Sequence, residues 1–84
     1  MNLYSNKTWL TKNNYFTSSV VAFFGPSPWN EEEANRKVMF LEISDCHGKI
    51  KLHKGEKETI KHFITKLEKL RNEIDKFISF LNKL

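Results

Sequence analysis

The sequence has few residues that form crosslinks or that end helices and strands: one cysteine, two prolines and three glycines among 84 residues. A single cysteine excludes a disulfide within the chain, and a lone thiol is typical of a reducing compartment. No segment approaches the roughly 20 apolar residues of a membrane span, and residues 1–12 lack the apolar run of a signal peptide. We therefore expect a soluble cytoplasmic protein that does not bind membranes.

Catalytic signatures are absent too: the sequence has no nucleophile elbow, phosphate-binding loop, dinucleotide-binding glycine motif or zinc-protease motif. Cys46 and His47 adjoin, but neighbouring side chains usually point apart, so His47 is poorly placed as a base for Cys46. Together with His53 and His62 they lack the spacing of a zinc site. The sequence predicts a protein that is not an enzyme and has neither cofactor nor metal.

The composition is that of a folded chain, with 39 % hydrophobic residues, 29 % charged residues and seven phenylalanines. A length of 84 residues predicts a single domain, residues 1–84. Such a domain buries only about 60 % of the surface of its unfolded chain, so a partner chain is a common source of added stability. The net charge of +4 mildly favours nucleic acid or an acidic partner, although a solvated basic surface explains it equally well.

Four segments have the alternation and the β-branched or aromatic content of strands. The turn residues between them predict two hairpins, because asparagine and glycine tolerate turn conformations. The Gly25–Pro28 segment is expected to stop the second strand, and Asn30–Ala34 forms either one helical turn or an acidic loop. The predicted strands are residues 7–12, 15–24, 37–44 and 49–53.

One long amphipathic helix is predicted from about Glu56 to Leu84, with no glycine or proline inside it. Its apolar residues repeat every seven positions in two series, which is the period of a helix that packs against another helix. The series are Ile60, Leu67, Ile74 and Leu81, and Phe63, Leu70, Phe77 and Leu84. The fold class is therefore α+β: a four-stranded antiparallel β-sheet of two hairpins, followed by one long C-terminal amphipathic helix (ββββα).

The two-residue period of strands divides the predicted sheet into two faces. One face, with Met39, Leu41, Ile43, Ile50 and Leu52, is expected to meet the helix. The other combines a basic row with aromatic residues, an arrangement that suits the stacking and phosphate contacts of single-strand binders. We predict a nucleic-acid or partner-binding surface here. The alternative is that the Pro26–Trp29 loop or a partner chain covers the aromatic residues and that the lysines form a solvated face. The predicted residues are His47, Lys49, Lys51, His53, Phe40 and Trp29.

A helix from Glu56 to Leu84 would be about 43 Å long, whereas a strand of six to eight residues spans about 20–27 Å. The C-terminal half of the helix therefore offers apolar surface that the sheet cannot cover. A second copy of the chain is the expected cover; the groove of a target protein, the first strand or the Trp29 loop are alternatives. The predicted dimer interface is Ile74, Phe77, Ile78, Phe80, Leu81 and Leu84.

Four antiparallel strands followed by one long helix, with a basic aromatic sheet, resemble in order the PC4-like and Whirly single-strand binders. No specific motif supports the resemblance, so it implies no residue roles. The abundance of Lys, Asn, Ile and Phe is typical of an AT-rich genome, and the small size is typical of phage or mobile-element accessory proteins. Two functions are expected: a homodimer that occupies a surface of a partner protein or nucleoprotein, as inhibitors of host or defence machinery do, or a single-stranded nucleic-acid-binding protein.

Overall fold

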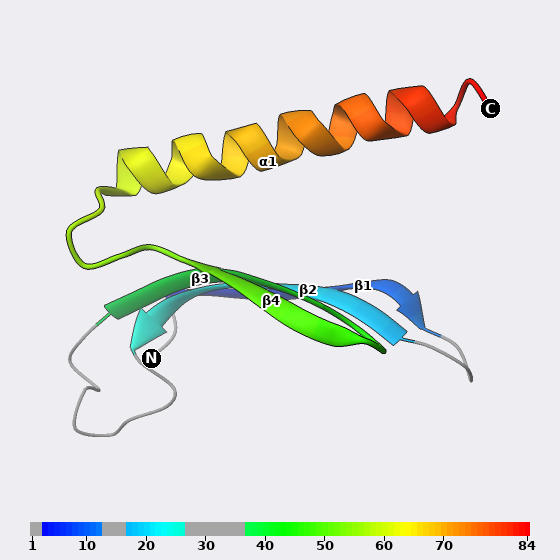
Figure 1. Cartoon of the computed structure of the whole chain (residues 1–84). Coiled ribbons are helices and arrows are strands. Elements are labelled where there is room, and N and C mark those ends of the chain that lie inside the picture. The colour runs from blue at the N-terminus through cyan, green and yellow to red at the C-terminus, as the bar shows by residue number, and fades with distance from the viewer. Residues whose placement is uncertain (1–2, 13–16, 27–36) are drawn as a thin grey trace. The chain divides into compact units, whose positions relative to one another are not determined.

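The computed structural model describes residues 3–12, 17–26 and 37–84, and within them it has four strands and one helix (Figure 1). By its internal contacts the chain forms two compact units, residues 1–53 with the sheet and residues 54–84 with the helix. The predicted turn at residues 13–14, the start of the predicted second strand, the Asn30–Ala34 segment and Trp29 lie outside the described residues. The expectations that the helix covers one face of the sheet, and that both units form a single domain, stay predictions.

The sheet unit is an antiparallel meander in which each strand pairs with its neighbours in the chain, in the order β1-β2-β3-β4. This confirms the predicted ββββα fold class. β1 begins three residues before its predicted start, β2 ends two residues after its predicted end, and β3 and β4 are each one residue longer than predicted. Their bounds are β1 (Tyr4–Lys12), β2 (Thr17–Pro26), β3 (Lys37–Asp45) and β4 (Gly48–His53).

β2 ends at Pro26, inside the segment that was expected to stop it but two residues after the predicted end at Phe24. Pro26 pairs with Lys37 at the first position of β3, whereas the pairing with β1 ends earlier, at Phe24. Beyond that point, among the residues that the structure describes, β2 pairs only with β3. A proline that lacks its N–H is tolerated at such a position because it removes little from the ladder.

The turn between β3 and β4 is built by two local features. The backbone N–H of His47 donates to Asp45 Oδ1 at 2.9 Å, so the aspartate side chain closes the turn. Gly48 follows with a φ of 155°, a conformation that residues with a Cβ rarely adopt. The predicted hairpin at residues 45–48 is thereby confirmed, with glycine at the position that needs it.

The helix α1 (Ile60–Leu81) begins four residues later than Glu56, the predicted start, and ends before Leu84. Thr59 is the N-cap, and its Oγ1 accepts a hydrogen bond from the backbone N–H of His62 at 3.0 Å. Residues 55–58 instead form a turn closed by the Glu58 N–H and the Gly55 carbonyl (3.1 Å). At 1.5 Å per residue the 22 residues of α1 extend over about 33 Å.

Candidate binding surfaces

The strand register sorts the sheet side chains into two faces, because residues paired across an antiparallel sheet point to the same side. One face, here called the apolar face, has Val20, Ala22, Phe24, Met39, Leu41, Ile43, Ile50 and Leu52, to which β1 adds Tyr4, Asn6 and Thr8 at one edge. The other face, here called the mixed face, consists of Lys7, Trp9, Ser19, Val21, Phe23, Phe40, Glu42, Ser44, Lys49, Lys51 and His53, with Ser5 and Val38 at one end. The register thus places four of the predicted binding residues, Phe40, Lys49, Lys51 and His53, on one face.

Phe40 lies in the centre of the mixed face, where it belongs to the packed interior of the sheet unit. It is 8 % exposed, and its ring stacks on that of Phe23 with centroids 5.1 Å apart and planes at 20°. His53 lies beside it, with its ring centroid at 6.4 Å. A ring packed in this way stabilises the sheet, and it offers little area on which a base could stack.

Lys51 is engaged within the same face. Its Nζ lies 3.3 Å from Glu42 Oε2 and 4.5 Å from the centroid of the Phe40 ring. Glu42 is its direct partner across the strands, so the ion pair follows from the register. The positive charge of Lys51 is therefore partly balanced before any ligand binds. Lys49 differs, since it is exposed and forms no ion pair with any described residue.

Trp9 and Lys7 form an exposed pair on β1 that the sequence analysis did not assign to any surface. Lys7 Nζ lies 4.2 Å from the centroid of a Trp9 ring, which is a cation–π geometry, and Trp9 is 46 % exposed. The alternation Lys7–Thr8–Trp9 was a usable signal, because it puts both side chains on one side of a strand. Their face was not deducible, since it depends on the β1–β2 register and on the irregularity between Trp9 and Thr11.

A row of paired residues crosses the sheet from Trp9 to Lys49. Trp9 pairs with Ser19, Ser19 with Ser44, and Ser44 with Lys49. The two serine hydroxyls are hydrogen-bonded to each other (3.1 Å), and Ser19 is 6 % exposed. The row therefore has small, mutually satisfied polar residues at its centre, with an exposed indole at one edge and an exposed ammonium at the other.

His47 and Lys49 also line a hollow of about 310 Å³ at the β3–β4 turn, together with Ile43 and Ile50. Cys46 in the same turn is exposed. Within the described parts of the chain, no three His, Cys, Asp or Glu side chains stand close enough to hold a metal ion. The turn is thus a small, partly apolar depression whose rim carries His47, Lys49 and the acidic Asp45.

In the helical unit, Glu58 connects the turn before α1 to its first turns. Its carboxylate accepts hydrogen bonds from the Gly55 backbone N–H and from Lys66 Nζ, both at 3.1 Å, and contacts His62 Nδ1. The Gly55 hydrogen bond is the main reason why the pKa of Glu58 lies below its ordinary value, with Lys66 and His62 adding to the effect and desolvation opposing it. Lys66 also lies over Phe63, the buried residue of α1.

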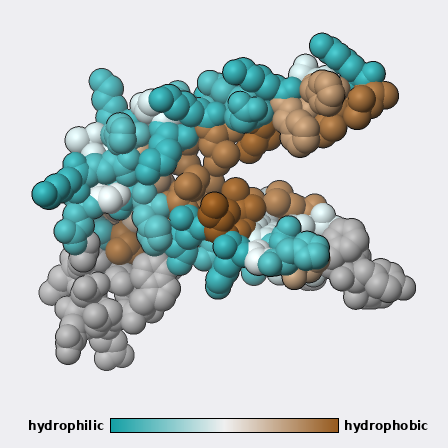
Figure 2. Space-filling model, in the orientation of Figure 1, coloured by the Kyte–Doolittle hydropathy of each residue, from teal (hydrophilic) through white to brown (hydrophobic). Residues whose placement is uncertain are grey.

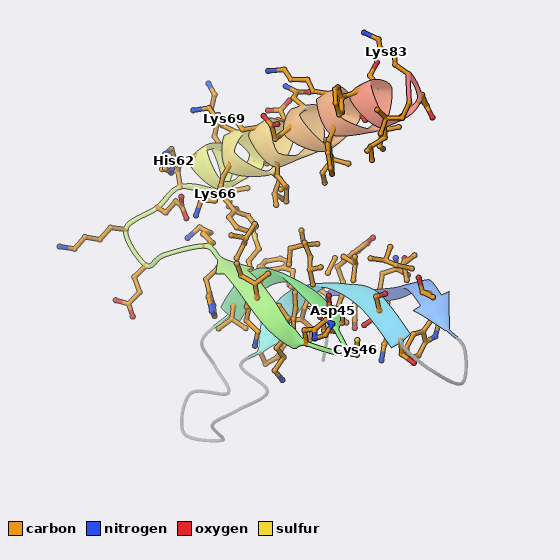
Figure 3. The ribbon with its side chains drawn as sticks, turned by 45° about the vertical axis from the view of Figure 1, so that its right-hand side comes forward. Asp45, Cys46, His62, Lys66, Lys69 and Lys83 are labelled. Carbon is orange, nitrogen blue, oxygen red and sulfur yellow. The ribbon has the colours of Figure 1, made fainter. Side chains whose placement is uncertain are left out.

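The apolar side of α1 is widest in its last heptad. Figure 2 shows apolar residues along one side of the helix and hydrophilic residues along the other, and in Figure 3 Lys69 and Lys83 project from the hydrophilic side. The six residues of the predicted dimer interface, here called the C-terminal stripe, all lie in this region. Their exposed fractions are Ile74 47 %, Phe77 59 %, Ile78 50 %, Phe80 57 %, Leu81 44 % and Leu84 89 %.

Within the part of the chain that the structure describes, no helix combines the length and apolar character needed to cross a membrane. No protein-family model matches this chain, and no curated protein or solved structure is significantly similar to it.

Proposed function

We propose that this chain is a small non-catalytic binding protein that forms a homodimer through the C-terminal stripe and acts by occupying a surface of a partner protein or nucleoprotein. The observation that carries the proposal is the exposure of six large apolar side chains within eleven residues, each at least 44 % exposed. Apolar patches of this kind are uncommon on soluble monomers and usually mark an interaction site.

The free-energy balance favours a dimer that depends on concentration. Full burial of side chains of this type stabilises by about 1.5–3 kcal/mol each, and roughly half of each surface remains to be buried here. Two copies would therefore gain on the order of 10 kcal/mol, against about 4–15 kcal/mol of lost translational and rotational freedom. At the lower end of that cost about 6 kcal/mol remains, which corresponds to a dissociation constant of roughly tens of micromolar, and the dimer weakens as the cost rises.

The basic mixed face supports contact with an anionic surface of the partner. His47, Lys49 and His53 are exposed along β4 and its turn, and the whole chain has a net charge of +4. Positive charge of this kind accelerates association with acidic protein surfaces and with nucleoproteins. The small size and lysine-rich composition support an accessory or inhibitory protein of a phage or mobile element, acting in the host-cell cytoplasm.

The dimer is tested by placing charge in the C-terminal stripe. Ile74→Asp with Phe77→Asp would bury unpaired carboxylates in the interface, so the variant is expected to be monomeric where the parent is dimeric. Asn72→Asp with Ser79→Asp makes the same charge change on the other side of α1 and is expected to leave the dimer intact. Circular dichroism checks that both variants are helical, and light scattering gives their masses. A dimeric stripe variant would contradict the proposal.

The partner is tested by a pull-down from host extract, with and without nuclease, using the parent and a Lys49→Glu variant. Lys57→Glu is the matched control, because it makes the same charge change outside the mixed face. A partner protein retained after nuclease treatment, bound by the control and lost by Lys49→Glu, would support the proposal. Binding that disappears with nuclease would favour the second candidate.

The second candidate function is binding of single-stranded nucleic acid on the mixed face, and the row from Trp9 to Lys49 specifically favours it. An exposed indole supplies a stacking surface worth about 1–3 kcal/mol per base, and the lysines at both edges supply phosphate contacts. The burial of Phe40 weighs against it, since the central aromatic of the face is already packed.

The nucleic-acid candidate is tested by the affinity for a labelled single strand at several salt concentrations. Trp9→Ala is expected to weaken binding about tenfold or more while Trp9→Phe retains most of it, and Lys49→Glu is expected to reduce the salt dependence. Lys51→Glu is a poorer test, because it would place two carboxylates opposite each other and disturb the sheet. A parent chain that does not bind at low salt would end this candidate.

A further inference from the structure

The heptad positions of α1 carry information on how two copies would pair. With Ile74 and Leu81 at the first position (a) and Phe77 and Leu84 at the fourth (d), the flanking positions are the fifth (e) and seventh (g). The e positions are Ile64, Arg71 and Ile78, and the g positions are Lys66, Glu73 and Phe80. Both flanks are therefore apolar in one heptad alone, the last one.

A parallel pair does not use these flanks well, because each g residue then meets the e residue five positions later in the other helix. Lys66 would meet the partner's Arg71, a like-charge contact. Glu73 would meet the partner's Ile78, a charge against an apolar side chain. The parallel arrangement thus places charge against charge and charge against apolar surface.

Antiparallel pairs bring e against e and g against g, and the register decides which residues meet. Full overlap of the helices places Arg71 against the partner's Arg71 and Glu73 against the partner's Glu73. A shift by one heptad places Ile78 against the partner's Arg71 and Phe80 against the partner's Glu73. A shift by two heptads places Ile78 against the partner's Ile78 and Phe80 against the partner's Phe80.

We infer that the partner of the C-terminal stripe is a second copy of this chain in antiparallel orientation, with the two-fold axis between the Ile78–Ile78 pair and the Phe80–Phe80 pair. This inference rests on the proposed dimer and specifies its geometry. Phe77 then packs against the partner's Leu81, and Ile74 packs against the partner's Leu84. Turn-type hydrogen bonds from the Lys83 and Leu84 N–H groups to Phe80 and Leu81 continue the winding past α1 and hold Leu84 near this position.

Charge and area agree with this register. In this register Arg71 does not meet the partner's Arg71, and Glu73 does not meet the partner's Glu73. Lys83 comes beside the partner's Glu73 at the rim, which is a favourable pair. Half-exposed side chains of this size offer roughly 100 Å² each, so two copies would bury on the order of 1,000 Å², near the lower limit of specific interfaces.

Disulfide trapping between two differently tagged chains tests the geometry, with the exposed Cys46 replaced by serine in both. A mixture of Phe77→Cys and Leu81→Cys chains is expected to give the mixed disulfide, at least about tenfold above either chain alone, because the Cα atoms must approach within about 7 Å. Ser79→Cys, on the opposite side of α1, is the control and is expected to remain uncrosslinked.

Each other outcome overturns a defined part of the inference. Self-crosslinked Phe77→Cys and Leu81→Cys chains would indicate a parallel dimer, and Phe77→Cys crosslinked to Ile74→Cys would indicate a shift of one heptad. A dimeric parent without these crosslinks would place the interface elsewhere. A parent that stays monomeric would remove the proposed dimer itself, so the two failures are distinguishable.

A charge swap gives a second test that leaves the apolar stripe unchanged. Lys83→Glu places a carboxylate beside the partner's Glu73 and is expected to raise the dimer dissociation constant about three- to tenfold. Combining it with Glu73→Lys restores an opposite-charge pair and is expected to return the constant to near the parent value. Equal constants for the parent and Lys83→Glu, or no restoration in the combined variant, would contradict the register.

Discussion

Replacing Phe40 distinguishes a structural aromatic from a ligand-binding one. The ring is 8 % exposed and stacked on Phe23, so Phe40→Ala removes buried area, the stack and the cation–π contact with Lys51, and it leaves a cavity. Substitutions of this kind destabilise by about 3–5 kcal/mol. A chain of 84 residues has about 4–13 kcal/mol of stability in total, so the variant is expected to lose a large part of it.

Urea unfolding followed by circular dichroism measures this loss. Phe40→Leu keeps most of the apolar area without the stack and is expected to lose about 1–2 kcal/mol. Leu10→Ala is the control: Leu10 is 56 % exposed, so a change within about 0.5 kcal/mol is expected. A loss below about 1 kcal/mol for Phe40→Ala would show that the ring is not part of the core. Phe40 would then again be a candidate residue for stacking on a nucleic-acid base.

Three further predictions concern local structure. Because the pKa of Glu58 is lowered in the folded chain, the stabilisation by its ionised carboxylate is fully present above the ordinary pKa of 4.5 and is lost as the pH falls through the lower, folded-state pKa. The far-UV circular dichroism signal of α1 is therefore expected to weaken in acid. The Glu58→Gln variant, which has no carboxylate to protonate, is expected to show a smaller change. Gly48→Ala is expected to lower the free energy of unfolding in urea by about 1–3 kcal/mol, because Gly48 has a φ of 155°. Gly55 has no positive φ, so Gly55→Ala is expected to change the free energy of unfolding little. Equal losses in the two variants would contradict this prediction. Thr59→Ala removes the N-cap and is expected to cost about 1 kcal/mol, Thr59→Ser much less, and a loss of helix signal in both alike would count against the cap.

The features that the sequence predicted correctly are those set by local period. The apolar repeat from Ile60 onwards defines α1, and the alternation in residues 37–44 and 49–53 assigns β3 and β4 to the same faces as the observed register does. Glycine in the β3–β4 turn was predictable for the same reason, since a tight turn restricts φ at a known position.

The features that the sequence did not predict depend on pairing or on side-chain capping. The sequence left open whether Phe40 is covered, but its stack on Phe23 depends on the pairing of β2 with β3, which no pattern within one strand reveals. The role of Trp9 depends on an irregular register, and the start of α1 depends on Thr59 acting as cap after a turn that Glu58 closes. The structure therefore supplies two kinds of information that the sequence does not, namely the long-range strand register and the geometry of the helix cap.

The most direct test of the proposed dimer is the molar mass of the unmodified chain as a function of concentration, measured by sedimentation equilibrium. The account predicts a mass that rises from the 10.0 kDa of one chain towards twice that value between micromolar and near-millimolar concentrations. The rise should disappear in the Ile74→Asp, Phe77→Asp variant and persist in the Asn72→Asp, Ser79→Asp control. A parent chain that remains at the mass of one chain at the highest concentration would contradict the account.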